Sequence, residues 1–211
     1  MILEIIKDDN QLGFGFCHKN DSKLIKEEVN KIKITLRDIK KYDISSSNEI
    51  EEYIDSIHLT REGKNGDRFM RSGTNFYMWG TMFIYIKLSH SILYYIDHII
   101  HECAHTALNI LNAKDELVTN APKERFPAPL RKDLRPMIGL FHALFVLNRV
   151  CGTFKKIISD KNYEYLDEAI QKYNDSLKKL KETYATVRAN AKTTPLGENI
   201  LNAIKIEWEL N

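Results

Sequence analysis

The segment from about Ser89 to Asn112 constrains the fold of this chain more than any other, because apolar residues recur through it at helical spacing. They cover an unusually wide face, which is typical of a helix buried in a protein core. We therefore expect a buried helix around which other parts of the chain pack. The apolar positions are Ile92, Leu93, Ile96, Ile99, Ile100, Cys103, Ala104, Ala107, Leu108 and Leu111.

This predicted helix carries the segment His101-Glu102-Cys103-Ala104-His105. Residues four apart on an α-helix lie about 40° apart around the axis and roughly 6 Å along it, so both imidazoles can reach one ion. HExxH on a helix is a metal-binding motif. The alternative is a pair of histidines that merely face polar neighbours. His98, on the same face, is either a partner of a ligand or an interior histidine.

Two protein ligands hold a metal ion weakly, so a third is expected elsewhere in the chain. His142 is the candidate: it lies 37 positions after His105 (142 − 105), inside the apolar run 140–145. A lone polar side chain on an apolar helix needs a buried partner. Either the ion is that partner, or His142 is a core histidine satisfied by a hydrogen bond.

Two arginines lie between the predicted metal helix and the helix of His142. Arg131 and Arg135 are framed by prolines in the segment 127–136, which reads PAPLRKDLRP. Guanidinium groups held in this way can bind a carboxylate through two parallel hydrogen bonds. Arg149 is a third candidate, two turns after His142 on the same helix face. The alternative for each arginine is a surface or capping salt bridge.

The remaining periodicity predicts further helices and a small amount of sheet. Charges and glycines predict a turn at 61–67, and the aromatic and β-branched stretch 75–88 predicts one or two strands. Asp21 or Ser22 is expected to cap the first helix. The expected helices cover 21–42, 48–56, 137–160, 165–187 and a terminal stretch after a break at 194–197.

A chain of 211 residues, 43% of them hydrophobic, is long enough for one globular domain with a substantial core. We expect a mainly helical α+β domain over 1–211, with a small sheet or hairpin beside the metal helix. Its parts would be a helical and strand region at 1–88, the metal helix, arginine loop and His142 helix at 89–160, and C-terminal helices at 161–211.

The charged and sulfur-containing residues restrict the class of protein. Basic and acidic residues number 31 and 29, which argues against a partner such as nucleic acid or an anionic membrane. Three cysteines without CxxC spacing suggest a reducing compartment. The first nine residues lack a signal-peptide pattern, and no segment reaches the roughly 18 apolar residues of a membrane span. We therefore expect a cytoplasmic protein, and nothing in the sequence indicates an oligomeric state.

The order of these motifs resembles the HExxH-type peptide β-hydroxylases, iron(II)- and 2-oxoglutarate-dependent enzymes that modify ribosomally made peptides. The resemblance extends over about 74–153, and the N-terminal seventy residues match only loosely. One departure is Leu130, where the family often has tryptophan, and it bears on the substrate more than on the metal. The matching segments are 101–105, 129–136, Gly139-Leu140-Phe141-His142, Asn148-Arg149-Val150 and 194–197.

This resemblance implies iron(II) held by His101, His105 and His142, with 2-oxoglutarate bound nearby. Arg135 or Arg131 would bind the distal carboxylate of 2-oxoglutarate. Bound together, iron and 2-oxoglutarate activate dioxygen to hydroxylate a carbon, here the β-carbon of a residue in a precursor peptide. Glu102 would be a ligand, a hydrogen-bond acceptor beside the ligands, or a group that contacts substrate.

Two other classes of protein fit part of the pattern. In a zinc metallopeptidase of HExxH type, Glu102 would be the general base for a zinc-bound water. The chain lacks the HExxHxxGxxH continuation, because positions 108 and 111 are leucine, and the arginine loop would have no task. A peptide-binding module without activity would leave the histidines without a role. By analogy with other HExxH enzymes, an exposed strand edge within 75–88 could hold an extended peptide substrate through main-chain hydrogen bonds.

Overall fold

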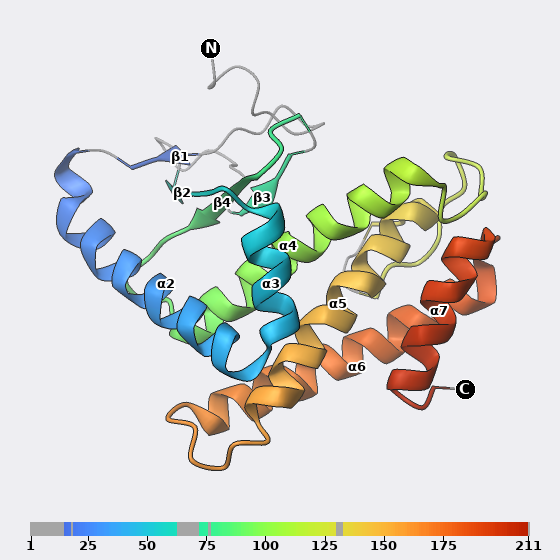
Figure 1. Ribbon diagram of the computed structural model, residues 1–211. Helices are drawn as coiled ribbons and strands as arrows, with labels where there is room; N and C mark the ends of the chain where they lie inside the picture. Colours follow the sequence, from blue (N-terminus) through green and yellow to red (C-terminus); the bar gives the residue numbers. More distant parts are fainter. Residues whose placement is uncertain (1–14, 18, 63–71, 76, 130–132, 211) are drawn as a thin grey trace. The chain divides into compact units, whose positions relative to one another are not determined.

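The computed structural model describes residues 15–17, 19–62, 72–75, 77–129 and 133–210 (Figure 1). Within these residues it contains six α-helices and a four-stranded sheet, so the expected mainly helical α+β fold is confirmed. Contacts within the chain divide it into two compact units, Met1–Thr106 and Ala107–Asn211. That the two form one domain stays a prediction. The turn expected at 61–67 lies largely outside the described residues.

The first unit begins with a pair of helices, α2 (Ser22–Tyr42) and α3 (Ile44–Tyr53). Asp21 stands at the start of α2, but its side chain makes no capping hydrogen bond. The carboxylate pairs with Arg61 at 2.6 Å, which ties the start of α2 to the sheet. A long-range ion pair has therefore replaced the expected local cap. The buried residues of α2 are Glu28, Ile32, Thr35 and Ile39, at spacings of four and three.

The second helix, α3, begins four residues earlier than its periodicity predicts, because Asp43 caps it. The Asp43 carboxylate accepts hydrogen bonds from the backbone N–H of Ser46 at 3.3 Å and from its hydroxyl at 2.8 Å. Asp43 is itself buried. An N-cap of this kind satisfies backbone donors that the first helical turn leaves unpaired.

The sheet of the first unit has the strand order β1-β2-β4-β3. Strand β2 (Ser56–Arg61) runs parallel to β4 (Thr81–Tyr85), while β1 (Gly15–Phe16) and β3 (Gly73–Thr74) pair antiparallel. The last four residues of β4 are buried, as expected for a central strand. Sequence periodicity did not indicate β2, and it placed β4 inside the longer stretch 75–88.

The rest of that stretch includes a tight hairpin loop between β3 and β4. Backbone hydrogen bonds from Met78 to Asn75 and from Thr81 to Met78 close it. Gly80 has φ of 74°, a conformation that costs other residues free energy. A Cβ at Gly80 would also come within 2.3 Å of the Asp55 carboxylate. Both constraints require glycine at this position.

A buried charge network joins α2 to the segment that leads into α4 (Ile92–Lys114). Glu28 is fully buried, and its carboxylate accepts the Tyr95 hydroxyl at 2.5 Å and the Lys31 ammonium at 2.8 Å. Lys31 Nζ also donates to the backbone oxygens of Leu88 and His90, at 3.2 and 2.9 Å. Burial, followed by the Glu28 contact, raises the pKa of Tyr95. A buried carboxylate needs such partners, because an unpaired one is costly.

Helices make up most of the second unit. Helix α5 (Met137–Ile157) packs along α6 (Leu166–Asn190), and α7 (Pro195–Glu207) follows (Figure 1). The expected break at 194–197 proved to be the start of α7: Thr194 accepts a hydrogen bond from the Gly197 N–H at 3.1 Å, and a proline opens the helix. Proline at the first helical position is favourable, since its missing N–H would be unpaired there anyway.

Among the described helices, α5 alone is long and apolar enough to cross a membrane, with a mean hydropathy of 1.5 over its most apolar stretch. Of that stretch, 61% is buried inside the structure. The core helix of a soluble protein has the same properties, so the apolar character of α5 is weak evidence for a membrane span.

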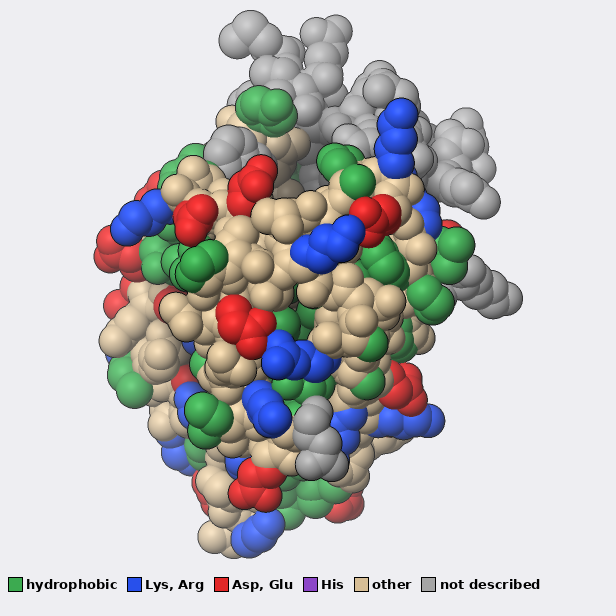
Figure 2. All heavy atoms as spheres, turned by 90° about the vertical axis from the view of Figure 1, so that its right-hand side faces the viewer, with side chains coloured by type: hydrophobic (Ala, Val, Ile, Leu, Met, Phe, Trp, Pro, Cys, Tyr) green, Lys and Arg blue, Asp and Glu red, His purple; other side chains and the backbone are tan. Residues whose placement is uncertain are grey.

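Charged side chains of both signs are interspersed on the face drawn in Figure 2, with hydrophobic side chains between them. The near balance of basic and acidic residues is therefore mixed on this face rather than sorted into large patches. A mixed surface produces no strong field of one sign.

Candidate metal centre

The predicted metal helix is α4, and it forms where its periodicity places it. Ser91 precedes the helix, and its hydroxyl accepts a hydrogen bond from the Tyr94 N–H at 3.1 Å, which caps the first turn. The apolar face is buried as expected, whereas His101 and His105 are only partly buried. Fully or almost fully buried positions include Leu93, Ile96, Ile99, Ile100, Cys103, Ala104 and Leu108.

His101 and His105 direct their imidazoles toward a common point. Their Nε2 atoms lie 3.2 Å apart, and the ring centroids lie 4.9 Å apart at an interplanar angle of 67°. Two nitrogens bonded to one ion at ~2.1 Å are roughly 3.0 Å apart at a right angle and roughly 3.4 Å apart at a tetrahedral angle. The observed separation lies between these values, so the spacing of the two Nε2 atoms is compatible with a shared metal ion. Without an ion, one ring would donate its Nε2 hydrogen to the other.

The surroundings of His101 favour its neutral form, which is the form that binds metal. Burial lowers the pKa of His101, and the neighbouring His98 lowers it further. Asp97, one turn earlier on the helix, has the opposite effect on the pKa of His101. Sequence reasoning missed Asp97, although an acid four residues before a ligand is a recognisable signal. A carboxylate in this position can orient a ligating imidazole.

Glu102 connects α4 to the edge of the sheet. Its side chain is buried and receives a hydrogen bond from the Thr74 backbone. Burial raises the pKa of Glu102 to about 8, and the Thr74 hydrogen bond opposes that rise. Thr74 belongs to β3, the edge strand, and Tyr85 N–H donates to the Ser72 hydroxyl just before it. Of the three roles expected for Glu102, this contact favours a hydrogen-bond acceptor beside the ligands.

No third ligand joins the pair within the described part of the first unit. More broadly, the residues that the structure describes contain no group of three His, Cys, Asp or Glu side chains that could hold a metal ion. His142 belongs to the second unit, so its convergence with His101 and His105 stays a prediction. The geometry within the first unit therefore brings together two of the three predicted ligands.

A stack of aromatic rings precedes the candidate ligands on α4. His90 stacks on Tyr94 at 3.6 Å, and Tyr94 stacks on His98 at 3.8 Å. The Nδ1 atom of His98 lies 2.9 Å from the Tyr94 carbonyl oxygen. Both the ring and the Nδ1 atom of His98 are thus engaged by Tyr94. Of the two alternatives for His98, these contacts favour an interior histidine over a partner of a metal ligand.

His90 makes the stability of the first unit depend on pH. Burial chiefly, with a smaller effect of His98, lowers the pKa of His90 to about 4 from an ordinary value of 6.5. The unfolded chain therefore takes up this proton more readily than the folded chain, so the contribution is complete above pH 6.5 and is lost as pH falls through about 4.

The variant His90→Phe keeps a ring to stack on Tyr94 but cannot titrate. Wild type should lose on the order of 2 kcal/mol more stability than His90→Phe between pH 7 and pH 4, after allowance for partial exposure of the ring. Urea unfolding at both pH values measures the difference. Equal losses in the two proteins would contradict the role given to His90.

Four of the expected site residues belong to the second unit, and the structure describes three of them, His142, Arg149 and Arg135. His142 is partly buried on α5, and burial lowers its pKa. Arg149 follows two turns later on the same face, and its guanidinium lies 5.1 Å from the Phe145 ring centroid. Seven helical residues rise about 10 Å, so a ligand that contacts both side chains must be several atoms long.

Arg135 is held by its own loop. Phe126 and Arg135 exchange backbone hydrogen bonds of 2.9 Å in both directions, which closes the loop as a narrow bridge. The Arg135 Nε atom lies 2.9 Å from the Asp133 carboxylate. This is the salt-bridge alternative expected for the loop arginines, although the side chain remains 36% exposed. Arg131 lies outside the described residues.

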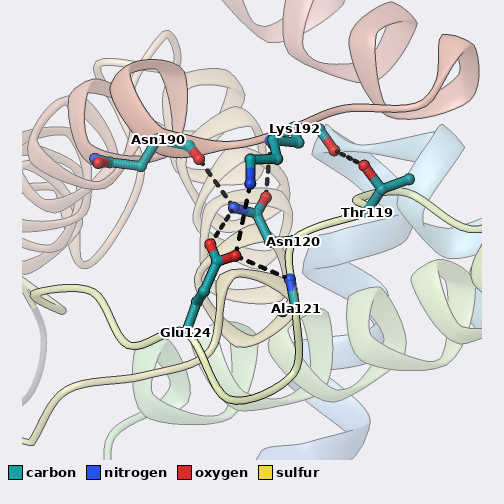
Figure 3. Close-up of polar contacts among 6 residues, drawn as sticks. All are labelled: Thr119, Asn120, Ala121, Glu124, Asn190 and Lys192. Carbon is teal, nitrogen blue, oxygen red and sulfur yellow. Dashed lines mark hydrogen bonds and ion pairs between the residues drawn. The ribbon is translucent and has the colours of Figure 1, made fainter.

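A polar cluster anchors the start of this loop to the α6–α7 junction (Figure 3). Asn120 donates to the Glu124 carboxylate at 3.0 Å and to the Asn190 carbonyl at 3.1 Å, and it accepts the Lys192 N–H at 2.7 Å. Glu124 also receives the Ala121 N–H at 3.3 Å. The Asn120 contact, followed by that of Ala121, lowers the pKa of Glu124. These hydrogen bonds hold the start of the arginine loop against the α6–α7 junction.

Neither a scan of protein-family models nor a search of curated proteins finds a match to this chain. The resemblance to peptide β-hydroxylases therefore depends on the motifs themselves, and the family stays a prediction.

Proposed function

We propose that this protein is an iron(II)- and 2-oxoglutarate-dependent dioxygenase that hydroxylates a side-chain carbon, the β-carbon, of a ribosomally synthesised peptide. The observation that carries the proposal is the 3.2 Å separation of the Nε2 atoms of His101 and His105 on a buried helix. Partial burial and a lowered pKa of His101 keep an imidazole in its ligand form. These features support a metal function, and the motif order supports this particular reaction.

In this proposal His101, His105 and His142 would hold iron(II). A three-ligand set of this kind leaves room for 2-oxoglutarate and dioxygen, which together supply the oxidising power for hydroxylation. Glu102 would keep the ligand helix attached to the sheet edge through Thr74. Asp97 would orient the His101 ring. The chain's own residues thus position the ligands and limit their access to water.

Arginine side chains would bind the distal carboxylate of 2-oxoglutarate. Arg149 is supported by its place two turns from His142 on the same helix face. Arg135 is supported by its place in a loop that backbone hydrogen bonds close. To bind 2-oxoglutarate, its guanidinium would have to give up the ion pair with Asp133. We further propose that the precursor peptide is met in the cytoplasm. None of the three cysteines, all of which the structure describes, forms a disulfide, and a reducing compartment keeps thiols in that state.

The test is anaerobic titration of the purified protein with iron(II), followed by 2-oxoglutarate. A weak visible charge-transfer band should appear only when both are present. Arg135→Ala or Arg149→Ala should raise the 2-oxoglutarate concentration that gives half the maximal intensity of this band by roughly tenfold. This is the loss of affinity expected for one charged hydrogen bond. Arg125→Ala is the matched control in the same loop, since that side chain is exposed and, among the described residues, donates to the carbonyls of Pro122 and Glu124. Iron binding without any response to 2-oxoglutarate would refute the dioxygenase.

A zinc metallopeptidase is the second candidate, and one observation favours it. The pKa of Glu102, raised to about 8, suits a general base that works near neutral pH. Zinc-dependent cleavage of an unstructured peptide, with no need for 2-oxoglutarate and with loss of activity in Glu102→Gln, would select this alternative. Failure to retain any metal would instead favour a peptide-binding module.

A further inference from the structure

A cleft of about 320 Å³ lies in the first unit, and its lining includes no residue of α4. Helix α2 contributes Leu36, Ile39 and Lys40, α3 contributes Ser47, Ile50 and Glu51, and residues 54–57 form the remaining wall. The floor is apolar, because Ile39 is fully buried and Ile50 nearly so. Lys40 and Glu51 form an exposed ion pair of 3.1 Å at the rim, and Asp55 adds a second carboxylate.

The wall formed by residues 54–57 includes the start of β2, whose edge is open among the described residues. Strand β1 pairs with Thr60 and Arg61 only, so no described strand lies beside Ser56–His58 on that side. The first four residues of β2 are correspondingly half-buried or exposed, in contrast to β4. Open strand edges offer unpaired backbone groups to another extended chain.

The hydrogen bonds of β2 show which backbone groups face this open side. Ser56 N–H donates to Gly80 O, and Thr60 O accepts from Ile86 N–H, so these two residues face β4. Backbone groups alternate in direction along a strand, so the N–H and C=O of Ile57 and Leu59 face away from β4. Leu59 O accepts the Cys17 thiol at 3.6 Å on that side. The Ile57 groups therefore face the open edge beside the cleft.

From these features we infer that the cleft binds an extended peptide segment, which pairs with Ile57 and inserts an apolar side chain between α2 and α3. Residues directly opposite each other on paired strands point to the same face. The partner of Ile57 would thus share the face on which Ile57 lines the cleft. Main-chain pairing with pockets for alternate side chains is a general mode of peptide recognition.

The size and charge of the cleft restrict its occupant. A volume of 320 Å³ takes only one or two side chains. A short segment therefore fits better than a second copy of this chain. Two carboxylates against one ammonium at the rim favour basic residues beside the apolar one. The site shares no residue with the proposed metal centre, so the inference does not depend on the proposed function.

The probe is a fluorescein-labelled nine-residue peptide with isoleucine alternating with serine and threonine, and with lysine at both ends. Its fluorescence anisotropy with the full chain should show saturable binding. A peptide N-methylated on the amides that would pair with Ile57 should bind at least tenfold more weakly, as should one with glutamate ends at low salt. Absence of saturable binding, or equal binding of the N-methylated peptide, would overturn the inference.

Protein variants test the same contacts from the other side. Ile57→Pro removes an N–H that faces away from β4, so it breaks no pairing with that strand, and it should weaken binding at least tenfold. Leu36→Trp should fill the cleft and weaken binding similarly. Ile44→Trp, on the exposed first residue of α3, is the matched control and should bind like wild type. If Ile57→Pro fails to fold, the N-methylated peptide and Leu36→Trp still decide, and wild-type affinity in Leu36→Trp would overturn the inference.

Discussion

His101→Ala and His105→Ala are each expected to abolish retention of a stoichiometric metal ion. The two Nε2 atoms lie 3.2 Å apart, so either substitution leaves one imidazole where two would share the ion. Loss of a group that only orients a ligand costs about 10–100-fold in metal affinity, and loss of a ligand itself should cost more. Metal content after gel filtration, measured for iron(II) under anaerobic conditions and for zinc in air, gives the readout.

His98→Ala is the control for this experiment, because His98 lies on the same helix but is occupied by Tyr94 through its ring and its Nδ1 atom. Its metal content should match that of wild type. Circular dichroism of all three variants separates loss of the ion from loss of the helix. Normal metal content in the His101 and His105 variants would refute the metal centre, whichever reaction it serves.

The histidine pair could be predicted from sequence because its geometry is local. A separation of four residues on a helix fixes the relation of the two rings before any tertiary contact forms. The breadth of the apolar face around 92–108 likewise predicted burial of α4 correctly. His142 is different: 37 residues and a loop separate it from His105, and no local rule sets that distance.

Contacts between distant segments explain what the sequence did not reveal. Strand β2 is short, and its pairing with β4 crosses some 25 residues (81 − 56), so tertiary context decides its conformation. The acceptor role of Glu102 depends on Thr74, which comes from the neighbouring edge strand. The Asp21 carboxylate, which was expected to cap α2, pairs instead with Arg61, forty residues away. In each case a long-range partner outweighed a local preference.

Gly197→Ala is expected to lower the free energy of unfolding of the second unit more than any other glycine-to-alanine substitution there. A Cβ at Gly197 would lie 2.0 Å from the Leu117 carbonyl oxygen and 3.0 Å from its carbon. Both atoms are backbone, so no side chain can rotate away. The loss should be at least about 3 kcal/mol, the range of severe overpacking. Urea unfolding followed by circular dichroism measures it.

Hydrogen bonds hold the Leu117 segment and the start of α7 together, so the backbone should relax little around an added Cβ. Thr194 N–H donates to Leu117 O at 3.2 Å, its hydroxyl donates to Glu116 O at 2.5 Å, and Val118 bridges to Thr193. Gly152→Ala is the matched control, because the nearest atom to its Cβ would be a Glu207 carboxylate oxygen at 3.7 Å. It lies inside α5, where alanine should stabilise by roughly 0.5–1 kcal/mol. Opposite signs for the two substitutions would establish that the α7 start is docked on Leu117, and a neutral Gly197→Ala would show that it is not.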